Sequence, residues 1–95
     1  MKGQRMPNDT PGPEIPVGGY ARQPWLEGER APASAAGRGG VWYVRDPIGG
    51  LGMIGREAHH ITEHEDGSIT VTPSIHNTAA GGWHGFLTAG VWRSC

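Results

Sequence analysis

The distribution of proline constrains this chain more than any other feature of its sequence. Six of its eight prolines lie before residue 33, and only Pro47 and Pro73 come later. Each proline fixes φ and removes a backbone donor, so neither a helix nor a central strand can persist between closely spaced prolines. We therefore predict an extended Pro/Gly-rich N-terminal arm and linker over residues 1–40, followed by a small β domain over residues 41–95.

Length and charge narrow the functional classes. The chain has 95 residues, which allows one modest domain, and the part after the arm is near the lower limit for an independent core. A net charge of -1 gives no basic patch for nucleic acid. No stretch approaches the roughly 20 apolar residues that cross a bilayer. We expect neither nucleic acid nor a membrane as a partner, and Cys95, the only cysteine, has no intrachain partner for a disulfide.

The segment after the arm has the composition of β-strands. Residues 41–45 are β-branched and aromatic between Gly and Asp-Pro, which predicts a strand. Residues 59–74 contain two β-branched runs around a turn, and a three-residue loop with Gly67 in the left-handed conformation pairs Ile61 with Val71. This register places the apolar side chains on one face and the polar ones on the other.

A second hairpin is predicted over residues 83–95. Its turn is expected at residues 88–90, which places Leu87 opposite Val91. No stretch shows a sustained helical apolar period, so the predicted fold class is mostly β, a small antiparallel β domain of four to six strands built from hairpins. The expected core consists of Val41, Trp42, Val44, Ile54, Ile61, Ile69, Val71, Ile75, Phe86, Leu87 and Trp92.

Two short motifs match known signatures but lack their context. Residues 50–55 read G-x-G-x-x-G, but no amphipathic helix follows to receive a pyrophosphate. Residues 60–64 read H-x-x-E-H, whose histidines converge on a metal only on a helix, whereas on a strand they lie about 13 Å apart. We expect no cofactor, and no nucleophile either, because the sequence indicates no acid-base partner for its serines.

A zinc site remains open as an alternative. Three histidines and the cysteine lie where strand ends and loops are expected, and imidazole and thiolate are the ligand types that zinc prefers. The candidate ligands are His59, His76, His84 and Cys95. Their spacing matches no established zinc pattern.

The arm carries isolated apolar side chains along a polar segment. Such a segment cannot bury enough apolar surface to offset its ordering entropy, so it is expected to be mobile in an isolated chain. One interpretation is a disordered tail with incidental apolar residues. The other, which we favour, is a docking arm whose apolar side chains fill pockets on a neighbouring subunit. The predicted partner-binding residues are Ile15, Val17, Tyr20, Trp25 and Leu26.

The C-terminal part of the chain resembles a known family. The matching positions are Asp66-Gly67, Pro73-Ser74-Ile75, Gly82-Trp83-His84-Gly85, and Gly90 with Trp92. Over residues 66–92 the chain is similar to a small β domain family of unknown function that is found in bacteria and in phages of high-GC actinobacteria. The resemblance implies a β fold and a phage setting, and it implies no mechanism.

Together these observations predict a non-enzymatic structural or interaction protein. The most concrete form is a phage virion component, namely a minor capsid, decoration or cement, or tail-associated protein that docks through its N-terminal arm. Its partners would be other virion proteins, such as the major capsid protein, or copies of itself, and it would be located in the virion after assembly in the host cytoplasm. The alternatives are a small zinc-binding module and a host-directed phage regulator.

Overall fold

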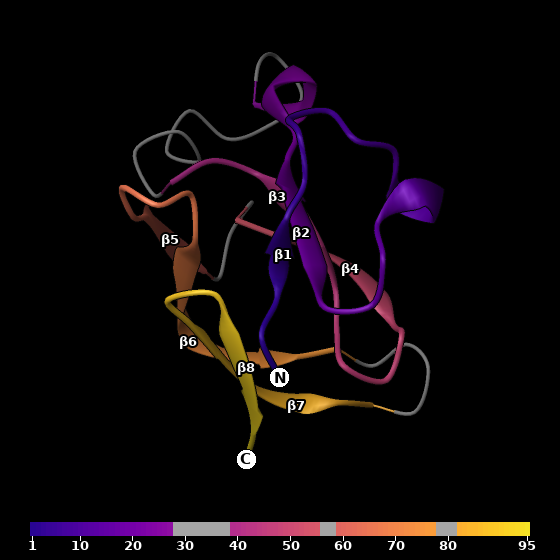
Figure 1. Cartoon of the computed structure of the whole chain (residues 1–95), viewed down its shortest axis with the longest axis vertical. Coiled ribbons are helices and arrows are strands. Elements are labelled where there is room, and N and C mark those ends of the chain that lie inside the picture. The colour runs from indigo at the N-terminus through magenta and orange to yellow at the C-terminus, as the bar shows by residue number, and fades with distance from the viewer. Residues whose placement is uncertain (28–38, 56–58, 78–81) are drawn as a thin grey trace.

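The structure, a computed structural model, describes residues 1–27, 39–55, 59–77 and 82–95. It consists of two four-stranded sheets (Figure 1). The first sheet has the order β1 (Gln4–Arg5), β2 (Gly19–Arg22), β3 (Trp42–Arg45) and β4 (Leu51–Ile54). The second has the order β5 (His60–Glu63), β6 (Ile69–His76), β7 (His84–Thr88) and β8 (Val91–Ser94). Two 3₁₀ helices, η1 (Gly12–Glu14) and η2 (Pro24–Leu26), flank β2. The predicted mostly β fold class is confirmed, and all pairings but the parallel β1–β2 pair are antiparallel.

The described part of the predicted arm, residues 1–27, is built into the β fold instead of lying apart from it. β2 pairs with β3, with Tyr20 opposite Val44, and β1 pairs with β2. Prolines do interrupt regular structure here, since Pro24 begins η2, but the interval between Pro16 and Pro24 is long enough for a four-residue strand. Residues 28–38 of the predicted linker lie outside the described residues.

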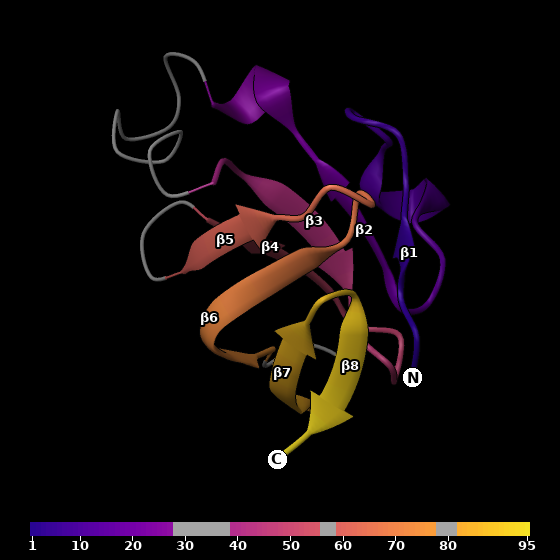
Figure 2. The ribbon, with the colours of Figure 1, turned by 60° about the vertical axis from the view of Figure 1, so that its left-hand side comes forward.

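The first five residues connect the edges of the two sheets. The Gly3 N–H donates to the Gly90 carbonyl at 2.7 Å, and the Trp92 N–H donates to the Met1 carbonyl at 2.8 Å, so the chain start runs along β8. β1 then continues along β2 in the other sheet. Figure 2 shows this N-terminal segment rising from beside β8 towards β2. One side of the space between the sheets is thereby closed by backbone hydrogen bonds.

The core lies between the sheets and draws on both. Trp83 and Trp92 meet edge to face at 5.3 Å between ring centroids, and the Trp92 indole N–H donates to the Gly18 carbonyl at 2.8 Å, which ties β8 to the loop before β2. The residues of this cluster are Tyr20, Trp42, Val44, Ile54, Ile61, Ile69, Val71, Ile75, Trp83, Leu87 and Trp92. Val41, which is fully buried, packs with Leu26 in a smaller cluster.

One predicted core residue is wrong. Phe86 is 45 % exposed, whereas the ten other predicted core residues are buried. Leu87 pairs with Val71 and points inward, and since successive side chains of a strand alternate, its neighbour Phe86 points to solvent. Two adjacent apolar residues on one strand left the inward one ambiguous in the sequence.

The hairpin registers were predicted correctly for the first hairpin and incorrectly for the second. Ile61 pairs with Val71, and Gly67 has φ 87°, as the three-residue loop requires. In the second hairpin Thr88 pairs with Val91 and Leu87 with Trp92, so the turn has only two residues. Ala89 and Gly90 both have positive φ, at 47° and 77°, which is the geometry of a two-residue type I′ turn.

A network of ion pairs connects the N-terminal segment to the second sheet. The Arg22 guanidinium holds Glu27 through Nε at 2.8 Å and Nη2 at 2.9 Å, and its Nη1 donates to Glu63. Arg5 also donates to Glu63, at 3.2 Å, and lies 4.6 Å above the Trp42 ring. The hydrogen bond from Arg22 lowers the pKa of Glu27, and the same bond raises the pKa of Arg22.

Candidate functional site

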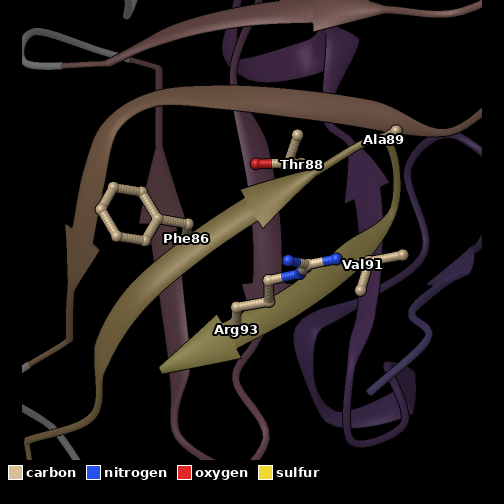
Figure 3. A pocket seen from close by; sticks show the side chains of 5 residues that line it. All are labelled: Phe86, Thr88, Ala89, Val91 and Arg93. Atoms are coloured by element: carbon tan, nitrogen blue, oxygen red, sulfur yellow. The ribbon is translucent and has the colours of Figure 1, made fainter. Parts of the chain in front are cut away.

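The outer face of the β7–β8 hairpin contains a hollow of about 500 Å³. Residues of β7 alternate between exposed and buried, so Phe86 and Thr88 face outward while Leu87 enters the core. On β8, Arg93 lies opposite Phe86 and Val91 lies opposite Thr88. Figure 3 shows these four side chains on one face, with Ala89 of the turn closing the hollow at one end.

The chemistry of this hollow is an exposed aromatic ring beside a cation. Among the described residues no carboxylate forms an ion pair with Arg93, in contrast to Arg5 and Arg22, each of which binds Glu63. Phe86 is 45 % exposed. Aromatic and arginine side chains are the types that most often contribute binding energy in protein interfaces. The hollow can therefore bind an apolar group that is accompanied by a negative charge.

A group of polar side chains lies on β6 and β7 beyond Phe86. His76 and His84 are register partners, with ring centroids 5.1 Å apart. Ser74 Oγ lies 3.0 Å from His84 Nε2, and the Ser74 carbonyl lies 3.1 Å from His59 Nε2. The sequence indicated no partner for Ser74, because the partner comes from the next strand. A serine nucleophile also needs a group that orients its base, and in the described part of the chain no carboxylate is bonded to His84.

The four candidate zinc ligands are thus neighbours without forming a metal cluster. The Cys95 N–H donates to the His84 carbonyl at 3.0 Å, so Cys95, which follows β8, lies beside His84, the register partner of His76. Over residues 1–27, 39–55, 59–77 and 82–95, no group of three or more His, Cys, Asp or Glu side chains is placed to hold a metal ion.

The predicted partner-binding residues are divided by the fold. Ile15, Tyr20 and Leu26 are buried within this chain, so in this structure their side chains pack inside the protein and are not exposed to a partner. Because β2 pairs into the first sheet, Tyr20 enters the core that the two sheets share, and Leu26 packs with Val41. Val17 and Trp25 are 48 % and 54 % exposed, and they lie before and after β2.

The two rejected motifs lie on strands. Four residues of the G-x-G-x-x-G match form β4, and His60 to Glu63 form β5. Neither segment places a helix N-terminus or a helical histidine pair in the described structure. The missed candidates, Phe86 and Arg93, had one usable signal, because an Ala-Gly turn of two residues puts both on the same face.

In comparisons with known proteins, no family model, no curated protein and no solved structure matches this chain. Among the helices that the described residues form, none is long and apolar enough to span a membrane. The site must therefore be interpreted from its own geometry.

Proposed function

We propose that this chain is a non-enzymatic docking protein and a structural component of a phage particle, of the minor capsid, decoration or tail-associated kind. In this proposal it docks through the outer face of the β7–β8 hairpin and not through an N-terminal arm. The observation that carries the proposal is the exposed Phe86 beside an Arg93 that has no ion pair among the described residues.

The chemistry of the hollow defines the segment that would bind it. Covering Phe86 removes apolar surface from water, and a buried aromatic side chain contributes on the order of 1.5–3 kcal/mol. Arg93 requires a carboxylate, because a guanidinium that is desolvated without a partner weakens binding. The partner is therefore a segment of another particle protein that presents an apolar side chain next to Asp or Glu.

The phage setting rests on the proposed resemblance of residues 66–92 to a β domain family found in bacteria and in phages of actinobacteria. The resembling positions include Gly90, which has φ 77° in the β7–β8 turn, and Trp92, which anchors β8 in the core. They also include Gly85, where a Cβ would meet the ring of Trp83 at 2.5 Å. The shared residues thus build the hairpin whose outer face forms the hollow.

The test is incorporation into particles. Particles of the phage that encodes the chain should contain it in a fixed stoichiometry by quantitative mass spectrometry. In a deletion strain complemented with Phe86→Ser or Arg93→Glu, we expect the incorporated amount to fall at least about tenfold, the effect of losing one interface anchor.

The matched control is Trp25→Ser. Trp25 is more exposed than Phe86, at 54 % against 45 %, and it was a predicted partner-binding residue. Docking through the hairpin is supported if the Trp25→Ser variant is incorporated normally and the Phe86→Ser variant is not. Absence of the wild-type chain from particles refutes the virion role. If only the Trp25→Ser variant fails to be incorporated, the docking surface lies at η2 and not at the hairpin.

A further inference from the structure

The edge of the first sheet formed by β4 lacks a backbone partner among the described residues. The Asp46 N–H donates to the Gly50 carbonyl at 2.9 Å, and the register continues with Val44 opposite Gly52. Because hydrogen-bonded pairs alternate along an antiparallel ladder, Gly52 bonds to β3 while the backbone groups of Leu51 and Met53 point away from it. No described backbone group binds those of Leu51 or Met53 on the outer side.

The side chains of this edge are apolar and accessible. Leu51 is 36 % exposed, Met53 is 44 % exposed, and Ile48 in the adjoining turn is 54 % exposed. Natural edge strands are normally protected against pairing by a charge, a proline or a bulge, and β4 contains none of these. The three other strands at sheet edges each carry a charged residue, namely Arg5, Glu63 and Arg93.

We propose that β4 pairs with β4 of a second copy, so that two first sheets join across a two-fold axis. Across such an axis, a charge on so short a strand would lie close to the same charge of the second copy, so self-pairing favours an uncharged edge, and β4 is the edge strand that meets this condition. Pairing with the extended segment of an unrelated partner does not require an uncharged edge. The absence of charged residues on β4 therefore favours a second copy of this chain as the partner.

The register of the pair follows from the direction of the backbone groups. With Gly52 on the axis, Leu51 of one copy lies opposite Met53 of the other, and the outward N–H and C=O groups of these residues bond to each other. Their apolar side chains then form cross-strand pairs on the same face. Since the strand has only four residues, we expect a weak dimer with a dissociation constant of about 10 µM to 1 mM.

Sedimentation velocity over a concentration series tests the dimer. The wild-type chain should shift from monomer to dimer, and Met53→Lys should weaken association at least about tenfold, because it places two like charges near the axis. The matched control is Phe86→Lys, since Phe86 is 45 % exposed and Met53 is 44 % exposed. This control should dimerise as the wild type does. A wild-type chain that remains monomeric up to about 1 mM, or equal weakening by both lysines, overturns the proposal.

A charge-swap experiment tests direct pairing. Met53→Lys and Met53→Glu should each be monomeric, but an equimolar mixture should dimerise, because residues 53 of the two copies are diagonal neighbours about 7–8 Å apart. A mixture that stays monomeric contradicts the register.

Hydrogen exchange requires no variant. The amides of Leu51 and Met53 should exchange more slowly as the wild-type concentration rises, and unchanged exchange at concentrations where a dimer sediments would place the interface elsewhere. The proposal does not rest on the virion role, because the dimer is lost through Met53 and docking through Phe86.

Discussion

The two sheets have the same number of strands but are held together by different contacts. In the second sheet, alternating apolar residues and tight turns specify the pairing, as in the Ile61–Val71 register. The first sheet depends on a side chain that reaches distant backbone groups: Arg45 donates to the carbonyls of Ile15 at 2.6 Å, Gly49 at 2.8 Å and Gly12 at 3.0 Å. The pairing of the second sheet is therefore encoded by local sequence, whereas the first sheet requires long-range contacts.

The largest loss of stability is expected from a substitution at the contact between the two sheets. Gly39 precedes β3 with φ 98°, and a Cβ at this position would overlap the carbonyl of Ile61 in β5. Gly39→Ala should therefore cost about 3–4 kcal/mol in free energy of unfolding, from the left-handed backbone together with the overlap. Urea denaturation measures it.

Gly82→Ala separates the two causes. Gly82 has φ 78°, but nothing lies within 4 Å of its Cβ position, so only the backbone strain of about 1–2 kcal/mol applies. Equal losses for the two variants would show that the approach of Gly39 to β5 contributes nothing to the junction.

The next largest loss of stability is expected from an arginine of the first sheet, and the matched arginine of the second sheet should contribute little. Arg45→Met removes the donors to three carbonyls and should lower the free energy of unfolding by about 2–3 kcal/mol. Arg93→Met is the matched change in the second sheet, and because Arg93 is exposed and has no ion pair among the described residues, we expect a change within about 0.5 kcal/mol. Both values come from denaturation at neutral pH.

Comparable losses for the two methionine variants would contradict the distinction between the sheets. They would mean that the second sheet also depends on its surface arginine.

These contacts explain which parts of the fold the sequence predicted. The first hairpin of the second sheet was predictable because alternation and Gly67 select one register. β2 was not, because its burial depends on Arg45 and Gln23 reaching carbonyls of the preceding loop, the latter donating to Thr10 at 2.9 Å. The sequence did not predict the hairpin site for a local reason. The β7–β8 turn was predicted one residue too long, and with that register Phe86 does not pair with Arg93.

The smallest effect concerns the pH dependence of the two sheets. The Glu27 side chain is 13 % exposed, and its carboxylate accepts hydrogen bonds from Arg22 and from the Val41 N–H, which lower its pKa. A lowered pKa in the folded state means that this stabilisation is complete above the unfolded value of about 4.3 and is lost as the pH falls through the folded value. Glu27→Gln should cost about 1–2 kcal/mol at pH 7, and its difference from the wild type should shrink below about pH 4.3.

Asp66 provides the comparison in the second sheet. The hydroxyl and N–H of Ser68 bond to its carboxylate at 2.6 and 2.9 Å and lower its pKa, so Asp66→Asn has the same sign. The Asp66 carboxylate is exposed, and water solvates it in both states, so the acid limb of its stability curve should change less than that of Glu27→Gln. Thermal unfolding of both variants from pH 3 to pH 7 measures the two curves. If Asp66→Asn flattens the acid limb as much as Glu27→Gln, then the shielded ion pair with Arg22 does not set the acid stability of the first sheet.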